Sequence, residues 1–536
     1  MQPGTSARPR ARWAALVALA SGVLLAYSFP QVGIWPFAIL SVAGLSWALD
    51  GRRARTGAWL GLLYGLAFFV PLLHWTGTYV GAFPWLLLAS AESGFMAALG
   101  AALAPVQRHR LAPFWIACLW VLQEFLRDRG PFGGFPWGRL AFSQASSPLR
   151  WFAAIGGEPL LTFAVALAGG ALFVLAKHVV ARDFSWRPVA ACVAVLVLLP
   201  VLSLVRGAVA PGTSGGGRPL RVALIQGSVP DRGLDSFDRA EQVLVNHVRE
   251  TMTLAQEVSD GTVPRPDLVV WPENASDVDP FRNQQAYQLI DQTVKAIDAP
   301  VLVGAILQGP GPTHRRNAGI LWSPTTGPGA EYIKRHPVPF AEYMPLRSIA
   351  DKLSSAAKLV TQDMVPGHTN GVLRGGPVRL GDVICFEVAY DSLVRSSVSA
   401  GAQLLVVQTN NATFGKTSET FQQLAMSRLR AIETGRTVLQ VSTTGASAII
   451  RPDGSVVAEN DDLFHPAILT AAVTPRTALT LADRVGPAPE YVLSALAFLG
   501  VAWTMLTALR RHRAQASTSA PVDGSADRPE TLVTTT

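Results

Sequence analysis

The chain has 536 residues, more than the roughly 100–200 residues that one ordinary hydrophobic core organises. Hydrophobic residues make up 49% of it and charged residues only 15%, whereas soluble domains carry about 25% charged residues. The shortage of charge is concentrated in residues 1–210, which excludes a uniformly soluble protein and predicts a membrane domain at that end.

The formal net charge of +8 comes largely from short basic clusters that flank apolar segments. These clusters begin at Arg8, Arg52, Arg108, Lys177 and Arg510. Arginine and lysine clusters of this kind are typical of the cytoplasmic ends of membrane helices. We therefore expect the protein to associate with a membrane and not with nucleic acid.

About eight apolar segments have the length and composition expected of membrane-crossing helices. They lie at 13–29, 33–49, 57–73, 84–104, 111–126, 158–177, 188–206 and 488–509. If these spans alternate in direction, every basic cluster falls on the same side of the bilayer. The pattern therefore predicts cytoplasmic termini and a polar domain on the opposite, extracytoplasmic side.

Composition divides the chain into five parts. An N-terminal membrane domain with seven helices occupies 13–206, and a linker rich in Gly, Ser and Pro follows at 207–219. A polar domain occupies 220–480 and the last predicted span 488–509. Residues 514–536, rich in Ser, Thr, Pro and Asp, are expected to form a disordered tail.

In the polar domain, apolar runs that predict strands alternate with segments that predict helices. The predicted strands are Leu220–Val229, Asp267–Trp271, Val301–Leu307, Ala318–Trp322, Tyr332–Ile333, Val378–Cys385, Gln403–Gln408, Val438–Val441 and Ala446–Arg451. The predicted helices lie at 237–258, 282–297, 389–400 and 421–435. This alternation favours an α/β domain.

The three cysteines suggest a free thiol rather than a disulfide framework. Cys118 and Cys192 lie inside apolar segments, where a cysteine is commonly a small buried hydrophobic residue. Cys385 lies at the polar end of a predicted strand and is free to react. The histidines have no metal-ligand spacing, so we expect no metal site and no cofactor.

Glu273 and Lys334 also follow predicted strands, and together with Cys385 they indicate thiol acyl-transfer chemistry. Glu273 is the predicted base for the thiol, although a single such glutamate also fits a helix cap. Lys334 is predicted to stabilise an oxyanion together with the amide of Phe386, although a surface lysine fits equally well. If the fold brings the three side chains together, the catalytic interpretation holds. If it does not, Glu273 is a helix cap and Lys334 is a surface lysine.

Further residues have less specific signals. Glu342 and Glu387 are predicted to support the site by orienting Lys334 or an incoming amine. The aromatic, Gly- and Arg-rich segment 127–157 reads either as a connector that only packs or as a contact for lipid headgroups. A Ser-centred site is not indicated, because the sequence has no Gly-x-Ser-x-Gly turn between a predicted strand and a predicted helix.

The motifs Trp271-Pro272-Glu273, Tyr332 to Pro345 and Ile384 to Glu387 resemble the Glu-Lys-Cys signature of the nitrilase superfamily. With the predicted spans added, residues 13–509 resemble the apolipoprotein N-acyltransferase family. The resemblance implies an α-β-β-α sandwich on a helical membrane domain. It also implies a multi-pass protein of the bacterial inner membrane.

The resemblance implies a reaction as well. A fatty acyl group would pass from the sn-1 position of a phospholipid to a thioester on Cys385, and then to the N-terminal amine of a diacylglyceryl-modified apolipoprotein. Substrate contacts are expected from Tyr343, Phe414, Phe237 and Trp137, and the protein is expected to be a monomer. Phe386, Thr413 and Phe237 stand where relatives often have Tyr or Trp, so headgroup and acyl-chain preference stay open.

Two other functions remain open at this stage. A membrane-tethered amidase of the same superfamily would use water as the acceptor, although one anchoring helix would suffice for it. A non-catalytic lipid-binding scaffold would not need Cys385. A lasting acyl adduct on Cys385 separates transfer from hydrolysis, and replacement of Cys385 separates both enzymes from the scaffold.

Overall fold

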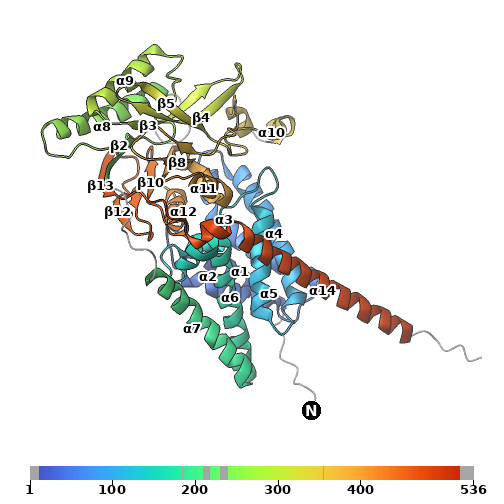
Figure 1. Cartoon of the computed structure of the whole chain (residues 1–536). Helices are drawn as coiled ribbons and strands as arrows, with labels where there is room; N and C mark the ends of the chain where they lie inside the picture. Colours follow the sequence, from blue (N-terminus) through green and yellow to red (C-terminus); the bar gives the residue numbers. More distant parts are fainter. Residues whose placement is uncertain (1–10, 184, 209–217, 230–238, 354, 519–536) are drawn as a thin grey trace, which may run out of the picture.

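The computed structural model describes residues 11–183, 185–208, 218–229, 239–353 and 355–518. Figure 1 shows long helices from both ends of the chain, with an α/β sandwich from its middle seated at one end of them. The helices are α1 (Ala11–Ser28), α2 (Pro36–Leu49), α3 (Ala54–Leu72), α4 (Ala82–Val106), α5 (Ala112–Arg127), α6 (Ala153–Ala181), α7 (Trp186–Ala208) and α14 (Ala488–Thr518). We call them the helical domain. Each predicted span lies on one of them.

Six of these helices are long and apolar enough to cross a membrane, within the part of the chain that the structure describes. The other two are shorter than the ~17 residues that a span requires, since α2 has 14 residues and α5 has 16. α5 also carries Gln123, Glu124 and Arg127, all buried against protein. The membrane character is therefore confirmed, while the number of about eight spans stays a prediction.

The predicted linker and the predicted last span, which flank the sandwich, both differ in their bounds from the observed helices. The predicted linker 207–219 begins inside α7, and residues 209–217 lie outside the described residues. α14 continues past the predicted span at 488–509 and through the first residues of the predicted tail, to Thr518. Residues 519–536 of that tail lie outside the described residues.

α3 and α4 pack with their backbones in direct contact. A Cβ atom on Gly57 would lie 2.3 Å from the carbonyl oxygen of Gly100, and one on Gly100 would lie 2.2 Å from that of Gly57. Only glycine fits at both positions. Small residues at such a crossing allow the close packing on which helix association in lipid depends.

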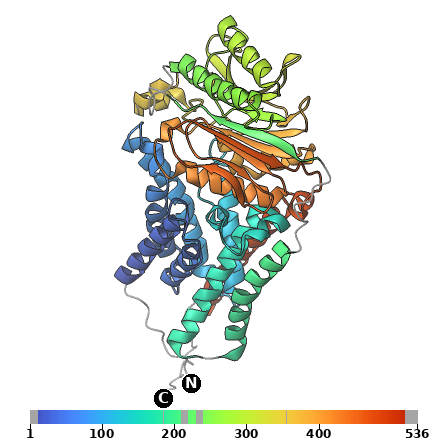
Figure 2. The same cartoon turned by 90° about the vertical axis from the view of Figure 1, so that its left-hand side faces the viewer.

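The basic turns between the helices gather at one end of the helical domain. Arg108, after α4, donates to the carbonyl oxygen of Arg52, which precedes α3. Lys177, near the end of α6, pairs with Asp50 at 3.0 Å. Figure 2 shows the joined ends of α6 and α7 at the end away from the sandwich. The structure thus groups three of the predicted clusters, and the side of the bilayer that they face stays a prediction.

Two sheets form the middle of the sandwich. The first has the order β13-β1-β2-β3-β4-β5, with β6 paired to β4, and the second has the order β12-β11-β10-β9-β8-β7. The strands are β1 (Leu220–Gln226), β2 (Leu268–Val270), β3 (Val301–Gln308), β4 (His314–Ser323), β5 (Gly327–Ile333), β6 (Asp363–Met364), β7 (Val372–Leu373), β8 (Leu380–Ile384), β9 (Leu404–Thr409), β10 (Val438–Ser442), β11 (Ser447–Ile450), β12 (Val456–Asn460) and β13 (Ala467–Val473). The central strands β1 to β3 and β8 to β10 run parallel and are buried, as their apolar sequences require.

Helices cover the outer face of each sheet. α8 (Ala240–Ser259) and α9 (Gln284–Ile297) share a core with alternate residues of the first sheet, such as Ala223 and Ile225. The intervening residues Val222 and Leu224 face the second sheet. α11 (Asp391–Ser399) and α12 (Glu419–Thr434) cover the second sheet. With α10 (Arg347–Leu353) and α13 (Leu481–Val485), these layers form the sandwich domain, and the predicted α-β-β-α fold is confirmed.

The sequence analysis found the central parallel strands but missed the short strands β6 and β7 and the closing strands β12 and β13. β13 pairs antiparallel with β1 along its whole length, from Leu220 opposite Val473 to Gln226 opposite Ala467. β12 is short and ends in Glu459 and Asn460, whereas β13 is apolar except for Thr470. Most residues of both strands are partly or fully exposed. They lie at or near sheet edges, where one face is open to solvent.

The sandwich domain packs on the helical domain through its α11 and α12 layer. One continuous apolar core contains residues of both, including Phe68 of α3, Phe142 before α6, and Leu429 of α12. Segment 127–157 lies in this junction, where Trp137 and Arg139 are buried. Of the two interpretations of this segment, the structure shows the packing role.

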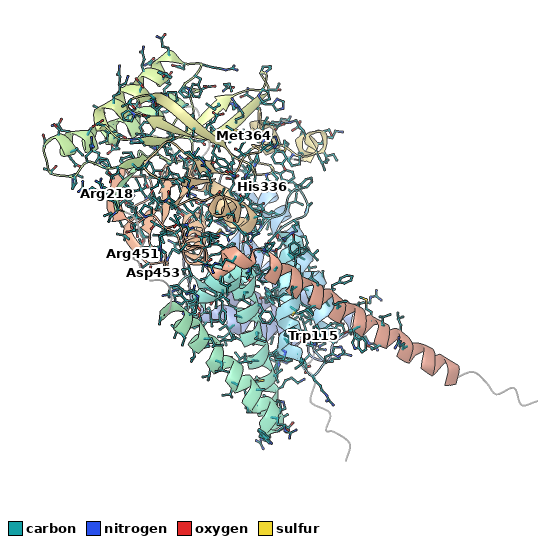
Figure 3. The ribbon with its side chains drawn as sticks, viewed as in Figure 1. Trp115, Arg218, His336, Met364, Arg451 and Asp453 are labelled. Atoms are coloured by element: carbon teal, nitrogen blue, oxygen red, sulfur yellow. The ribbon has the colours of Figure 1, made fainter. Side chains whose placement is uncertain are left out.

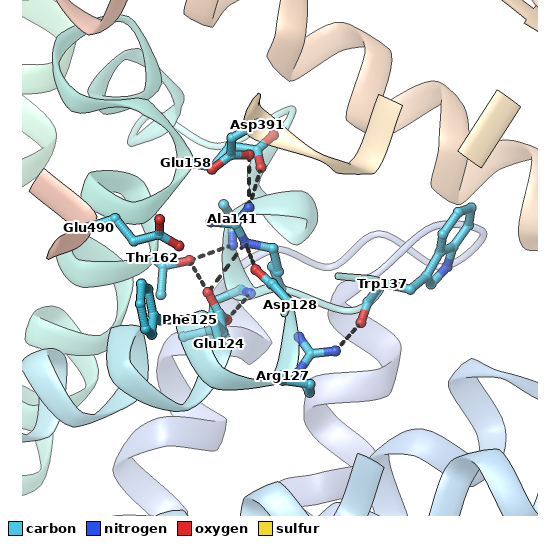
Figure 4. Close-up of polar contacts among 12 residues, drawn as sticks. Glu124, Phe125, Arg127, Asp128, Trp137, Ala141, Glu158, Thr162, Asp391 and Glu490 are labelled. Carbon is cyan, nitrogen blue, oxygen red and sulfur yellow. Dashed lines mark hydrogen bonds and ion pairs between the residues drawn. The ribbon is translucent and has the colours of Figure 1, made fainter. Parts of the chain in front are cut away.

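A buried cluster of charges crosses the same junction. Arg139 contacts Glu158 of α6 at 3.2 Å and Asp391 of α11 at 2.8 Å. Arg430 of α12 contacts the same two carboxylates, Glu158 at 3.2 Å and Asp391 at 2.9 Å. Figure 4 shows Asp391 and Glu158 side by side at the boundary, with Glu124 below them. Arg139 and Glu158 belong to the helical domain, and Asp391 and Arg430 belong to the sandwich domain. The ion pairs among these four residues therefore join the two domains.

Arg139→Leu tests this cluster. We expect the full chain to lose about 3–5 kcal/mol of stability, because buried carboxylates would lose a shared cation. The thermal unfolding midpoint in detergent measures the loss. Arg249→Leu, which removes an exposed pair with Glu250, is the matched control and should cost no more than about 1 kcal/mol. Equal shifts in the two variants would contradict the importance of the cluster.

Candidate active site

Three strand ends meet at one edge of the sandwich and bring the predicted residues together. Glu273 follows β2, Lys334 follows β5, and Cys385 follows β8. The ammonium of Lys334 lies 3.1 Å from Oε1 of Glu273, and both side chains are almost fully buried. Cys385 is close enough for both charges to act on the pKa of its thiol. The structure therefore excludes both a helix-capping Glu273 and a surface Lys334.

Glu342 completes a carboxylate pair around the cation. Its Oε2 lies 2.9 Å from the ammonium of Lys334. The amide of Asn317, on β4, donates to Glu273 at 2.7 Å and to Glu342 at 3.1 Å. The ammonium is thereby held between two acids, and a neutral amide holds the acids in place. Glu342 thus contacts Lys334 as the sequence analysis expected, and its role in the reaction stays a prediction.

Glu273 is also fixed by the second sheet. Its Oε2 accepts a hydrogen bond from the backbone N–H of Asn410 at 2.9 Å, directly after β9. Its carbonyl oxygen accepts from the hydroxyl of Thr443 at 2.7 Å, directly after β10. The carboxylate therefore bridges the two sheets at the edge where Cys385 lies, which fixes its direction relative to the sulfur.

Burial and neighbouring charges set the protonation states of the three groups. Burial raises the pKa of the Cys385 thiol, Glu273 raises it further, and Lys334 opposes them. Burial also raises the pKa of Glu273, against the opposing effect of Lys334. Burial lowers the pKa of Lys334, but Glu273 and Glu342 outweigh it and hold that pKa well above its usual value. The resting site thus contains a neutral thiol and a permanent cation, so the thiol needs a base.

Cys385 lies on a sharp turn. Its φ of 55° falls in the left-handed region, which is rare for a residue other than glycine. The chain passes here from β8 into a 3-10 turn at Cys385–Ala389. A strained backbone of this kind persists only where surrounding contacts fix it, and such positions cluster at functional sites.

Glu387 supplies those contacts. Its carboxylate accepts from the backbone N–H of Ile384 at 2.9 Å, from those of Arg335 at 2.7 Å and His336 at 3.0 Å, and from the hydroxyl of Tyr332. It thereby ties the Cys385 turn to the chain that follows β5 and carries Lys334. We expected Glu387 to orient Lys334 or an amine, and the structure shows it bound instead to the backbone on both sides.

Phe386 connects the site to the helical domain. Its ring stacks on that of Trp137 with centroids 5.6 Å apart and planes 3° apart, and on that of Phe135, also at 5.6 Å. Trp137 in turn donates from Nε1 to Gln422 of α12 at 2.6 Å. The predicted use of the Phe386 amide as an oxyanion donor stays a prediction.

His336 lies at the same boundary, and Figure 3 shows it where the sandwich domain meets the helical domain. Its ring centroid is 4.1 Å from that of Tyr390, whose hydroxyl donates to Gly134 at 2.9 Å. Burial, followed by the charge of Lys334, lowers the pKa of His336 to about 4. The side chain is therefore neutral at pH 7 and packs at the junction.

Two of the three remaining predicted substrate contacts, Phe414 and Tyr343, lie in the described part of the chain. Phe414 packs edge-on against Trp75 of the helical domain, with ring centroids 4.8 Å apart. Tyr343 follows Glu342, and its carbonyl oxygen accepts from Phe340 at 2.8 Å. Phe237 lies outside the described residues. For all three, binding of substrate stays a prediction.

Sequence analysis missed the polar residues that surround the three predicted ones. Thr409 is the last residue of the apolar strand β9, Asn410 follows it, and Thr443 follows β10, so all three lie at strand ends as Glu273 and Cys385 do. That signal was present in the sequence and was not used. Asn317 lies within β4 between Arg316 and Ala318, and its role depends on contacts with Glu273 and Glu342, which are distant in sequence.

The chain matches two family models and a relative over most of its length. Residues 21–171 match the family model described as Apolipoprotein N-acyltransferase N-terminal domain, and residues 221–481 match the one described as Carbon-nitrogen hydrolase. An apolipoprotein N-acyltransferase from Mycolicibacterium smegmatis is 41% identical over 516 residues, 92% of this chain and 85% of that protein. The chain belongs to the apolipoprotein N-acyltransferase family.

A second relative agrees with this membership. An apolipoprotein N-acyltransferase from Geobacter metallireducens is 32% identical, over 88% of this chain and 91% of that protein. Among solved structures, an amidase from Nesterenkonia sp. aligns with 51% of this chain and 95% of its own, at 21% identity and a TM-score of 0.36. The predicted family is confirmed, and the protein is an acyltransferase with a nitrilase-like domain on a helical membrane domain.

Glu387→Gln tests the positioning contact in this acyltransferase. An amide has one acceptor oxygen, so at least one backbone N–H near Cys385 or Lys334 would lose its partner. We expect a loss of about 1–3 kcal/mol in stability and slower acyl transfer. Thermal unfolding and a transfer assay measure these effects. Glu331→Gln, on the exposed side of β5, is the control and should change neither; an unchanged Glu387→Gln protein would refute the positioning role.

Proposed function

We propose that this protein transfers a fatty acyl group from the sn-1 position of a phospholipid, through a thioester on Cys385, to the N-terminal amine of diacylglyceryl-cysteine apolipoproteins. The names of its relatives support acyl transfer to apolipoproteins. The observation that carries the mechanism is the partly buried Cys385 thiol beside the ion pair of Glu273 and Lys334, in a domain that shares one apolar core with membrane helices.

The first half of the reaction loads the enzyme. Glu273 takes the proton of the Cys385 thiol while the sulfur attacks the ester carbonyl carbon. The ammonium of Lys334 and the amide of Phe386 stabilise the negative charge that develops on the carbonyl oxygen. When the carbon–oxygen bond breaks, Glu273 returns the proton to the departing lysophospholipid. The acyl group then remains on Cys385 as a thioester.

The second half transfers the acyl group. The neutral α-amine of the acceptor attacks the thioester carbonyl, and Glu273 takes a proton from the nitrogen. The same two donors stabilise the second oxyanion. The carbon–sulfur bond then breaks, an amide is released, and Glu273 reprotonates the departing sulfur. The cycle needs no cofactor and leaves the site in its resting state.

A location follows from this reaction. We place the protein in the bacterial inner membrane, with the sandwich domain on the extracytoplasmic face and the termini in the cytoplasm. The grouping of the basic turns at the far end of the helical domain supports this orientation, because such clusters mark the cytoplasmic side. Trp137, Phe414 and Tyr343 are the proposed substrate contacts, and we propose that a single copy is active.

The transfer proposal is tested by following one labelled acyl chain. The full-length protein in detergent is mixed with a phospholipid carrying a ¹³C-labelled sn-1 chain, and its intact mass is measured over time. We expect one acyl adduct that maps to Cys385 and moves to the amine of an added diacylated lipopeptide. Cys385→Ala should form none, whereas Cys192→Ala should behave as the native protein does. Rapid release of free fatty acid without the lipopeptide would instead indicate a hydrolase.

The role of Glu273 predicts a pH dependence. Because burial raises the pKa of Glu273, adduct formation should begin to fall, as the pH is lowered, above the ~4.3 of an ordinary glutamate. Lys334 keeps its charge, so no loss is expected on the mildly alkaline side. Glu273→Gln should slow adduct formation about 10²–10⁴-fold, while Glu331→Gln should not. A rate independent of pH and of Glu273 would overturn this role.

A further inference from the structure

The sulfur of Cys385 has polar neighbours that the mechanism above does not use. The hydroxyl of Thr409, at the end of β9, lies 3.3 Å from the sulfur. Nε2 of Gln423, on α12, lies 3.7 Å from it, within range of a hydrogen bond to sulfur. Both side chains are fully buried. They come from the second sheet and the helix that covers it, whereas Lys334 comes from the first sheet.

A chain of hydrogen bonds fixes the direction of the Gln423 amide. The hydroxyl of Ser442 accepts from the N–H of Gly445 at 2.7 Å and donates its single proton to Oδ1 of Asn411, also at 2.7 Å. Nδ2 of Asn411 must therefore face the other way. There it donates to Glu419 at 2.6 Å and to Oε1 of Gln423 at 3.2 Å.

The orientation of Gln423 follows from these contacts. Its oxygen faces the donors of Asn411 and Thr409, so its nitrogen faces Cys385. An amide nitrogen only donates hydrogen bonds. Gln423 thus directs the positive end of its amide dipole at the sulfur, and it cannot accept the thiol proton.

Thr409 has one proton and two acceptors. Its Oγ1 lies 2.9 Å from Oε1 of Gln423 and 3.3 Å from the sulfur of Cys385. When the Cys385 thiol is protonated, the Thr409 hydroxyl donates to the nearer Oε1 of Gln423. When Cys385 is a thiolate, the Thr409 hydroxyl forms a stronger hydrogen bond by donating to the sulfur, because hydrogen bonds to an ion are stronger. Oε1 of Gln423 keeps the donor of Asn411 in either state.

We propose that Thr409 and Gln423 hold the Cys385 sulfur as it becomes a thiolate, each donating one hydrogen bond to the developing negative charge. This inference rests on the proposed function, in which Cys385 is the nucleophile. In this scheme Glu273 removes the proton of the thiol. Lys334 and the Phe386 amide stabilise the negative charge on the carbonyl oxygen. Thr409 and Gln423 stabilise the negative charge on the sulfur. The pair acts again when the sulfur departs in the second half of the cycle.

The other charges near the sulfur come from three elements. Glu273 and Lys334 approach from the strand ends, and Glu419 approaches from the first turn of α12. A charged Glu419 would oppose a thiolate, but burial raises the pKa of Glu419 to about 8. It is therefore largely neutral at pH 7, and its bond to Asn411 serves to fix the chain of amides.

The test measures the sulfur directly. The rate at which iodoacetamide alkylates Cys385 is followed against pH in the full-length protein in detergent, with the modified peptide identified by mass spectrometry. Thr409→Val keeps the shape and removes the donor, so the midpoint of the profile should rise by about one pH unit. Thr409→Ser should restore the native midpoint. Thr417→Val is the matched control, because within the described residues the Thr417 hydroxyl has no hydrogen-bond partner.

Gln423→Met provides an independent variant if Thr409→Val does not fold, and its midpoint should rise as well. A native midpoint in Thr409→Val and Gln423→Met would overturn the proposal, even if acyl transfer fell, because a purely structural role does not move the titration of the sulfur. The readout needs no lipid. Failure of the acyl-transfer proposal would instead appear as a Cys385→Ala protein that still transfers acyl groups.

Discussion

The placement of the sulfur relative to the membrane helices depends on one guanidinium group. Arg430 donates from Nε to the carbonyl oxygen of Val388, three residues after Cys385, at 2.8 Å. Its other nitrogens contact Asp391 at 2.9 Å and Glu158 of α6 at 3.2 Å. Arginine suits this position because its planar fork keeps its charge when buried and offers donors in several directions. The Cys385 turn is thereby fixed to the helical domain as well as to its own sheet.

The site itself combines permanent charge with a neutral nucleophile. The carboxylates of Glu273 and Glu342 keep Lys334 protonated, so the proposed oxyanion partner already carries its charge before the reaction. Burial has the opposite effect on Cys385, because it opposes ionisation of the thiol. In the proposed mechanism the negative charge on sulfur therefore appears only during the reaction. Preorganised donors around both oxygen and sulfur suit that requirement.

The sequence was sufficient for the parts of this structure that depend on local pattern. Apolar runs located the helices and the parallel strands, and polar residues at strand ends located Glu273, Lys334 and Cys385. The resemblance to a known family supplied the sandwich. β13 is apolar except for Thr470, so its pattern was present in the sequence and was overlooked. The strand-end position of Thr409 was a usable signal that was not used. Asn317 and Gln423 matter only through contacts between distant segments, and Glu387 differed from expectation because its backbone partners are set by the fold.

The pairing of β1 with β13 has a mechanical consequence. β1 begins soon after α7 and β13 ends shortly before α14, and the two strands run antiparallel as neighbours from Leu220 and Val473 onward. The first and last strands of the sandwich are thus hydrogen-bonded to each other. A pull along the chain on either α7 or α14 therefore acts on the same end of the same strand pair.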